Sequence, residues 1–117
     1  MTWDVRLWSD VESWLLGLDD DSYDVIAAAI DHLADKGAVL GRPLVDRIKG
    51  SRHHNMKELR PGSASATEIR VLFAFDTKRR AILLIAGDKS GQWKKWYDES
   101  IPIADDRFDE WLDGEEG

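Results

Sequence analysis

Residues 67–86 read TEIRVLFAFDTKRRAILLIA, and this stretch decides the fold. Residues 67–76 alternate between apolar and polar types with the period of a β-strand. This alternation places four large apolar side chains on one face: Ile69, Val71, Phe73 and Phe75. Residues 81–86 are continuously apolar, which favours a central strand. The link between the two segments is short enough for a hairpin, so we predict neighbouring antiparallel strands.

The flanking segments predict helices and further strands. Residues 3–7 alternate like a strand, and Ser9 with Glu12 has the form of a capping box for a short helix. Acidic residues at 19–21 suit the start of a second helix that closes at Lys36 and Gly37. Residues 44–48 favour a short strand or turn, and residues 55–60 are extended. A C-terminal amphipathic helix is expected from Pro102.

The order of these elements is β-α-α-β-β-β-α, without a linker or an internal repeat. We therefore predict one α+β domain over residues 1–117, a small antiparallel sheet packed against helices. The chain has 117 residues, of which 43% are hydrophobic, so it can build a core. No apolar run approaches the ~20 residues of a membrane helix, and the N-terminus lacks a signal-peptide layout. The absence of cysteine fits a reducing cytoplasm, where we expect the protein to act.

The net charge of −7 argues as a total against nucleic-acid binding. The charge is unevenly distributed, however. Residues 42–95 hold 13 Lys/Arg and 5 Asp/Glu, a net of +8, whereas the two flanks together carry −15. Such asymmetry predicts a basic working surface, with the acidic helices facing away from it.

The histidines do not predict a metal site. His53 and His54 are adjacent, His32 is the third, and the chain has no cysteine. Adjacent side chains rarely share a metal, and this spacing matches no zinc pattern, so we expect neither a metal nor another cofactor. A general base at His53 or His54 stays open, because histidine titrates near neutrality.

Four short segments together resemble a known family. They are residues 56–60 (MKELR), 68–73 (EIRVLF), 83–91 (LLIAGDKSG), and Trp96-Tyr97 followed by residues 101–104 (IPIA). Their order and spacing are similar to those of the RelE/HigB-type toxins of bacterial toxin–antitoxin modules, in particular the phage-related Gp49-like branch. The resemblance implies a RelE-like fold, endonucleolytic cleavage of mRNA on the ribosome, and neutralisation by a small helix-turn-helix antitoxin.

RNA cleavage through the 2′-hydroxyl requires a base, cations beside the phosphate, and an acid for the departing oxygen. The resemblance assigns these roles to five residues: Lys57, Arg60, Arg70, Lys89 and Tyr97. We expect Arg60 and Arg70 to hold the scissile phosphate, because a guanidinium matches phosphate oxygens. Lys57 or Lys89 would be the base, and Tyr97 would stack on a nucleobase or assist proton transfer.

Four further residues are expected to contact RNA: Trp93, Lys94, Lys95 and Trp96. Two alternatives stay open within the same fold. One is a ParE-like inhibitor of DNA gyrase. The other is a non-catalytic module that pairs with an antitoxin or binds RNA without cutting it, which Lys89 favours because many relatives have arginine at this position.

Overall fold

A five-stranded sheet forms the centre of the computed structural model, which describes residues 3–61, 68–88 and 91–116. The strands are β1 (Asp4–Leu7), β2 (Val45–Arg47), β3 (Lys57–Leu59), β4 (Ile69–Phe75) and β5 (Arg80–Asp88). Their order across the sheet is β1-β5-β4-β3-β2. The predicted hairpin of β4 and β5 is therefore central, as its apolar sequence requires.

The helices are α1 (Ser9–Leu16), α2 (Asp20–Lys36) and α3 (Trp93–Glu116), with a short 3-10 turn η1 (Gly37–Val39) after α2. The α+β class is confirmed, and β2 adds one strand to the predicted order where a strand or turn was open. Strand β1 runs parallel to β5, whereas the other pairings are antiparallel. Helices α1 and α2 lead the chain from β1 at one edge of the sheet to β2 at the other edge, and the antiparallel run from β2 to β5 then returns it beside β1.

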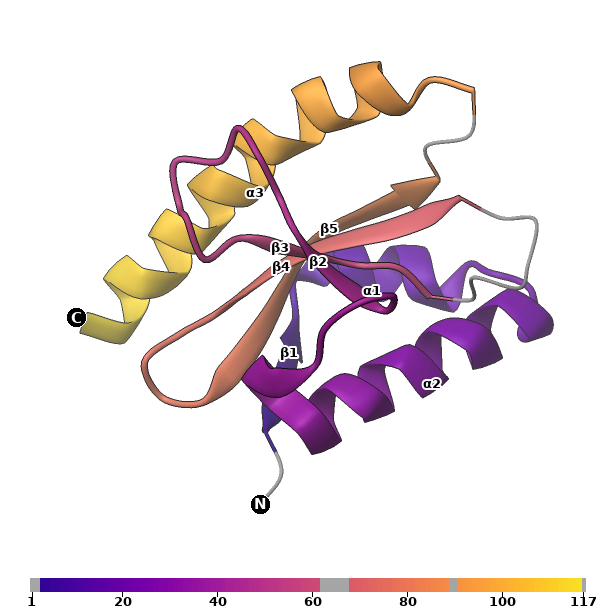
Figure 1. Cartoon of the computed structure of the whole chain (residues 1–117), viewed down its shortest axis with the longest axis horizontal. Coiled ribbons are helices and arrows are strands. Elements are labelled where there is room, and N and C mark those ends of the chain that lie inside the picture. The colour runs from indigo at the N-terminus through magenta and orange to yellow at the C-terminus, as the bar shows by residue number, and fades with distance from the viewer. Residues whose placement is uncertain (1–2, 62–67, 89–90, 117) are drawn as a thin grey trace.

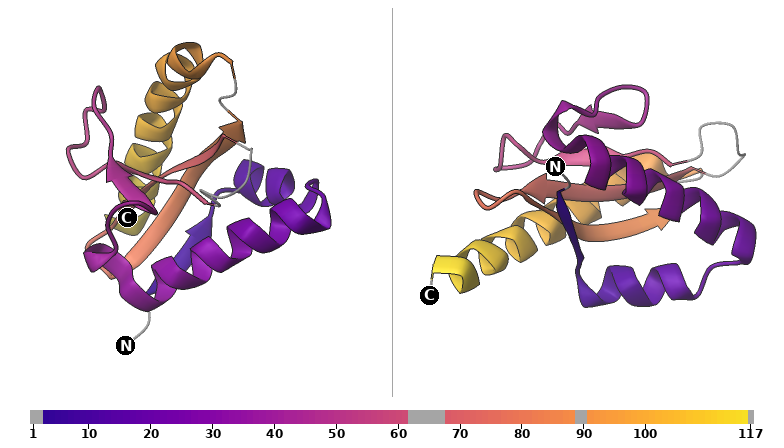
Figure 2. Two further views of the ribbon diagram at one scale, coloured as in Figure 1. Left: turned by 45° about the vertical axis from the view of Figure 1, so that its right-hand side comes forward. Right: turned by 90° about the horizontal axis from the view of Figure 1, so that it is seen from below.

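Helices cover both faces of the sheet, with α3 on one side and α1 and α2 on the other (Figures 1 and 2). The cluster beneath α1 and α2 contains Val11, Ala29, Leu33, Val45, Leu59, Val71, Phe73, Ala81 and Leu83. The cluster beneath α3 contains Met56, Leu72, Ala74, Ile82, Leu84, Ile101, Ala104 and Phe108. The face of β4 that carries Arg70 is thus also a core face, which the alternation alone did not indicate.

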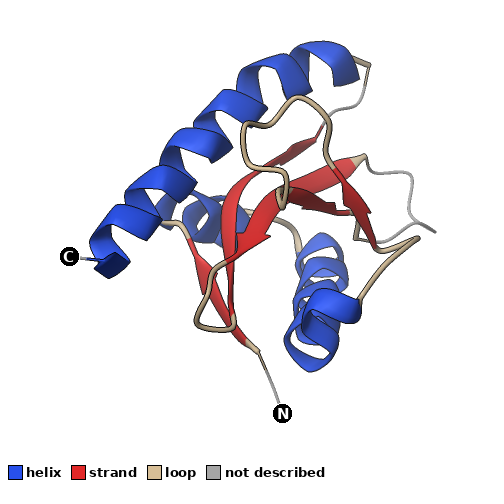
Figure 3. Cartoon of the chain, turned by 60° about the vertical axis from the view of Figure 1, so that its left-hand side comes forward, coloured by secondary structure: helices blue, strands red, loops and turns tan. Residues whose placement is uncertain are grey.

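Helix α3 starts nine residues earlier than predicted, at Trp93, and continues through Pro102. Figure 3 draws it as one uninterrupted helix that leads to the C-terminus. A proline inside a helix lacks the N–H for one backbone hydrogen bond and costs ~3 kcal/mol. Burial of Ile101, Ala104 and Phe108 against the sheet offsets that cost. The prediction of a helix start at Pro102 was therefore wrong, because tertiary packing outweighs the local preference.

The ends of α2 agree with the sequence prediction, whereas the start of α1 does not. Asp19 is the N-cap of α2, and its carboxylate accepts a hydrogen bond from the Ser22 N–H at 2.7 Å, as predicted. Gly37 ends α2 with φ of 58°, and a Cβ atom there would lie 1.9 Å from Nε1 of Trp3. The predicted capping box of α1 does not form, because Trp8 is the N-cap and Ser9 lies inside the helix.

Candidate functional site

A groove of about 440 Å³ lies between the segment after β2 and the first half of α3. Its lining residues are Arg47, Ile48, Lys49, Gly50, Glu58, Arg60, Trp93, Tyr97, Asp98, Ile101 and Pro102. We call this hollow the α3 groove. It brings together three of the predicted site residues from segments more than 30 positions apart: Arg60 and Tyr97, which the resemblance assigned, and Trp93, which was expected to contact RNA.

Glu58 lies at the centre of the polar contacts in the α3 groove. Strand β3 pairs Glu58 with Leu72, so its side chain points to the α3 face of the sheet. Only 2% of Glu58 is exposed. Its Oε1 accepts hydrogen bonds from Nε of Arg60 at 2.8 Å and from Nη2 of Arg60 at 2.7 Å. Its Oε2 accepts one from the Tyr97 hydroxyl at 2.5 Å.

Glu58 was not among the predicted site residues. The available signal was alternation, which places Glu58 and Arg60 on one side of the extended segment and Lys57 on the other. Arg60 also pairs with Asp46 of β2, with Nη2 and Oδ2 separated by 3.2 Å. Burial works to lower the pKa of Arg60, but the carboxylates of Glu58 and Asp46 outweigh burial and raise it. Arg60 is therefore a fixed cation at the edge of the groove.

The pKa of Tyr97 is raised above its ordinary value, first by burial and then by the hydrogen bond and charge of Glu58. The guanidinium of Arg70 opposes this rise and thus lies within reach of the phenol. The phenol is protonated at neutral pH, as an ordinary tyrosine is. Tyr97 is therefore a hydrogen-bond donor in the groove.

Arg70 lies on β4 opposite Gly87 of β5 and on the face opposite Ile69 and Val71, as the alternation predicted. This is the face that α3 covers. The Nη1 of Arg70 donates to the carbonyl oxygen of Ile69 at 2.8 Å. Its Nε is buried and has no hydrogen-bond partner among the described residues. Trp96 packs over Gly87, where a Cβ atom would lie 2.4 Å from the indole Nε1. Arg70 is thus held between the start of α3 and the sheet.

The structure does not bring Lys57 to the α3 groove. Lys57 pairs with Phe73 in the sheet, and its Nζ lies 5.7 Å from the centroid of the Phe75 ring on the opposite face. A smaller hollow of about 290 Å³ contains Lys57 together with Arg42, Asp46 and Arg47. Lys89, the other predicted base, lies outside the described residues.

The predicted RNA-binding residues of α3 have different surroundings. Trp93 is 60% exposed at the mouth of the groove. Trp96 is half-buried and packs edge-on against Tyr97, with ring centroids 5.1 Å apart. Lys94 pairs with Asp98 at 3.0 Å and Lys95 with Glu99 at 4.0 Å, both on the exposed side of α3. Trp93 is therefore the aromatic surface that a ligand of the groove can reach.

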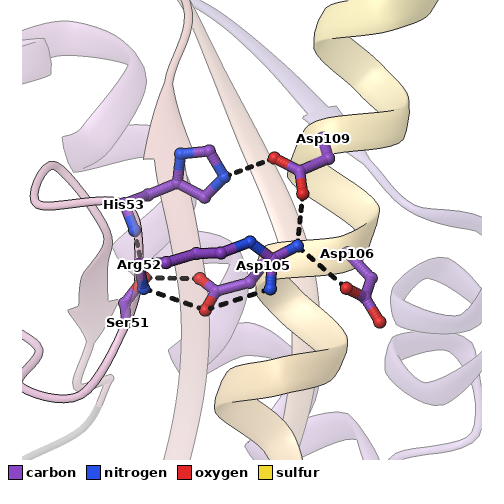
Figure 4. A network of polar contacts seen from close by, with 6 residues as sticks. All are labelled: Ser51, Arg52, His53, Asp105, Asp106 and Asp109. Carbon is purple, nitrogen blue, oxygen red and sulfur yellow. Dashed lines mark hydrogen bonds and ion pairs between the residues drawn. The ribbon is translucent and has the colours of Figure 1, made fainter.

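A second polar network, shown in Figure 4, ties the loop after β2 to α3. The backbone N–H of Arg52 donates to Asp105 at 3.1 Å, and Ser51 also donates to Asp105. The Arg52 side chain pairs with Asp106 at 2.9 Å and with Asp109. These contacts fix the loop that carries Lys49 and Gly50 to the groove.

The same network includes His53, one of the two adjacent histidines. His53 Nε2 is 2.7 Å from Oδ1 of Asp109, and the His53 ring packs edge-on against Phe108. Hydrogen bonds from Arg52 and then from His53 hold the pKa of Asp109 below its usual range. Neither His53 nor His54 lines the α3 groove. The geometry thus does not place the alternative general base beside Arg60 and Tyr97.

The basic middle segment and the acidic flanks of the sequence are only partly separated in the folded structure. Arg47, Lys49 and Arg60 gather at the α3 groove. Arg52, by contrast, is paired with three aspartates of α3. The expectation that the acidic helices face away from the basic segment was wrong for α3. Its carboxylates neutralise cations of that segment.

The described residues contain neither a metal-binding cluster nor a membrane-spanning helix. They contain no group of three or more His, Cys, Asp or Glu side chains arranged to hold a metal ion. Within the same part of the chain, no helix has both the length and the apolar composition needed to cross a membrane.

Solved structures define the class of fold. The RelBE2 toxin–antitoxin complex from Mycobacterium tuberculosis matches with a TM-score of 0.56 and 13% identity, over 75% of this chain and 99% of that chain. The archaeal RelE–RelB complex from Pyrococcus horikoshii OT3 gives 0.57 and 17%, over 78% and 99%. A mutant of the E. coli toxin RelE in the free state gives 0.57 and 6%, over 80% and 90%. The fold is therefore RelE-like.

Sequence comparison identifies the family. The family model described as Phage derived protein Gp49-like matches residues 13–109, and the chain belongs to this family. It is 55% identical over 102 residues to a candidate toxin designated HigB2 from Mycobacterium tuberculosis, covering 87% of this chain and 51% of HigB2. It is 52% identical over 113 residues to the candidate toxin HigB3 of the same organism, covering 97% and 96%. The chain thus spans about half of HigB2 and nearly all of HigB3, and its resemblance to RelE/HigB-type toxins is confirmed.

Proposed function

We propose that this chain is the toxin of a toxin–antitoxin module and acts as an endoribonuclease that cleaves mRNA on the ribosome without a metal ion. The observation that carries the proposal is the α3 groove, where Arg60 and the protonated Tyr97 meet on a buried carboxylate and Arg70 lies within reach of the phenol. The membership of the Gp49-like family and the similarity to HigB2 and HigB3 support the same function.

The proposed reaction is an attack of the RNA 2′-oxygen on the neighbouring phosphorus. The bond from phosphorus to the 5′-oxygen breaks, which leaves a 2′,3′-cyclic phosphate and a 5′-hydroxyl. A base accepts the 2′-hydroxyl proton, and an acid supplies a proton to the departing 5′-oxygen. Arg60 and Arg70 would stabilise the charge that develops on the phosphate oxygens.

Tyr97 and Trp93 would act on the bound RNA in different ways. The Tyr97 hydroxyl has one proton, which it donates to Glu58 in the structure, so a hydrogen bond from Tyr97 to the phosphate or the departing oxygen requires this proton to turn from Glu58 to the substrate. The exposed indole of Trp93 offers a stacking surface for an unpaired base at the mouth of the groove. Arg47 and Lys49 line the same groove and would attract the RNA backbone.

An antitoxin is the proposed protein partner. The RelBE2 and RelE–RelB structures that share this fold are toxin–antitoxin complexes. A small helix-turn-helix protein is the antitoxin that the family resemblance implies. A neighbouring reading frame encoding such a protein, whose co-expression restores growth, is the expected finding.

Controlled expression in bacteria tests the proposed function. Induction of the intact chain is expected to stop growth and to create new RNA 5′ ends within translated frames. Arg70→Ala is expected to abolish both effects, whereas Arg6→Ala is expected to retain them. Arg6 is a matched control because it is an exposed strand arginine on β1.

Two results would contradict the proposal. DNA damage without new RNA ends would instead indicate a gyrase inhibitor. Normal growth, with formation of an antitoxin complex, would indicate a non-catalytic module.

A further inference from the structure

Three carboxylates are buried among the described residues: Glu58 at 2% exposure, Asp76 at 8% and Asp105 at 3%. A buried carboxylate must be satisfied by hydrogen bonds, because its desolvation is otherwise costly. The identity of the donors therefore shows what each carboxylate holds in place.

Asp76 and Asp105 accept hydrogen bonds from backbone N–H groups and so fix the conformation of the main chain. Asp76 Oδ1 accepts from the N–H groups of Lys78 at 2.9 Å and Arg80 at 3.0 Å, which closes the β4–β5 turn. Asp105 accepts from the N–H of Arg52 at 3.1 Å and from Ser51, which fixes the loop after β2. Both residues thus stabilise chain turns.

Glu58 differs from both, because the donors described at its carboxylate are side chains of the α3 groove. Oε1 binds the Arg60 guanidinium and Oε2 binds the Tyr97 hydroxyl. Arg60 comes from the end of β3 and Tyr97 from α3, so Glu58 joins two separate elements across the groove. Its side chain is 3% exposed, which leaves it little room to touch a bound ligand.

We propose that Glu58 is a positioning residue, which sets the Tyr97 hydroxyl and the Arg60 guanidinium at the spacing that the reaction requires. This inference rests on the proposed function and deepens it. Groups that are held in place before the substrate binds need not be reorganised during the reaction. The carboxylate of Glu58 also fixes the orientation of the Arg60 fork.

The distinguishing variant is Glu58→Gln, which keeps the shape and one acceptor oxygen but removes the charge. Asp76→Asn is the matched control, because Asp76 is also buried and also accepts from an arginine and from an aromatic residue of α3. Circular dichroism and urea unfolding of both variants establish the folded fraction. Rates of mRNA cleavage are expressed per folded molecule.

The first measurement is the ¹³Cζ NMR signal of tyrosine in the full chain. The chain has two tyrosines, Tyr23 and Tyr97, so each gives an assignable signal. Glu58→Gln is expected to move the Tyr97 signal and to leave that of Tyr23, which lies on α2. Asp76→Asn is expected to move neither. A Tyr97 signal at its wild-type position in Glu58→Gln would overturn the inference.

The second measurement is single-turnover cleavage of mRNA on programmed ribosomes. Glu58→Gln is expected to lower the maximal rate about 10- to 100-fold, as misplacement of reacting groups does. Its affinity for ribosomes is expected to be unchanged or tighter, because a negative charge has been removed from the groove. Asp76→Asn is expected to cleave at the wild-type rate.

A purely structural defect would lower the affinity and the rate together, or would affect Asp76→Asn equally, and either result would overturn the inference. If the wild type cleaves and Glu58→Gln cleaves as fast, the inference fails and the proposed function stands. If the wild type cleaves no RNA but the Tyr97 signal responds to Glu58→Gln, the proposed function fails and the positioning contact stands.

Discussion

Two similar arrangements lie at opposite ends of α3. At one end Glu58 accepts hydrogen bonds from Arg60 and Tyr97. At the other end Asp76 accepts from Arg80 at 2.8 Å and from the indole of Trp111 at 3.0 Å. The difference is that Asp76 also accepts from two backbone N–H groups of a tight turn. The comparison indicates that the Asp76 end serves the fold and that the Glu58 end serves the groove.

The largest expected effect is on stability at the Asp76 end. Asp76→Ala leaves two backbone N–H groups, the Arg80 side chain and the Trp111 indole without their acceptor. Removal of one partner from a buried, charged network costs about 3–5 kcal/mol. Urea unfolding is expected to show this loss, with wild-type RNA cleavage by the protein that stays folded. A stability close to that of the wild type would break the comparison.

The next effect concerns activity at the Glu58 end. Tyr97→Phe removes one hydroxyl, which lowers the cleavage rate about 10- to 100-fold if Tyr97 acts in the reaction. The free energy of unfolding is expected to fall by less than about 2 kcal/mol, because Arg60 still pairs with Glu58. Single-turnover cleavage and urea unfolding of the same preparation measure both quantities. Trp111→Phe is the corresponding change at the other end, and unchanged cleavage is expected there.

Gly87→Ala tests the Glu58 end of the comparison, because it displaces Trp96, an aromatic residue that lies beside the α3 groove. The new Cβ would lie 2.4 Å from Nε1 of Trp96, so the indole and the start of α3 must shift. Such overpacking typically costs about 1–3 kcal/mol. Thermal unfolding is expected to show this loss, together with slower cleavage. Gly41→Ala is the control, since no atom lies within 4 Å of its added Cβ.

The smallest effect is a dependence of stability on pH. Burial raises the pKa of Asp76, but hydrogen bonds from Trp111, from the backbone at Arg80 and Lys78, and from the Arg80 side chain outweigh burial and hold it below 3.8. A lowered folded-state pKa contributes stability that is present above 3.8 and is lost as the pH falls through the folded value. The stability difference between wild type and Asp76→Asn is therefore expected to shrink between pH 6 and pH 3, by at most about 1 kcal/mol.

Urea unfolding across this pH range measures that difference. A gap between wild type and Asp76→Asn that widens on acidification would contradict the assignment of a lowered pKa to Asp76.

The central hairpin was predictable because its pattern is local. Alternation and a continuous apolar run are direct consequences of burial in a sheet, so β4 and β5 follow from residues 67–86. The parallel pairing of β1 with β5 was not predictable in the same way, since it depends on contacts between distant segments. The start of α3 was missed because its packing against the sheet overrides the local effect of Pro102.

The candidate site was predictable only in part, and mainly from the family resemblance. Arg60, Tyr97 and Trp93 meet in the α3 groove, whereas alternation already placed Lys57 on the other face. Glu58 was missed because a single glutamate in a short strand is usually interpreted as a surface residue. Its role becomes visible only when α3 brings Tyr97 across the sheet, over 39 positions in the sequence.

Primer extension on mRNA in programmed ribosomes, incubated with the purified chain, tests the central claim most directly. Cleavage within the frame is expected for the wild type and for Arg6→Ala. A loss of at least about 100-fold is expected for Arg70→Ala, in line with removal of one group that stabilises a transition-state charge. Intact mRNA with the wild-type protein, or equal cleavage by Arg70→Ala, would contradict the account.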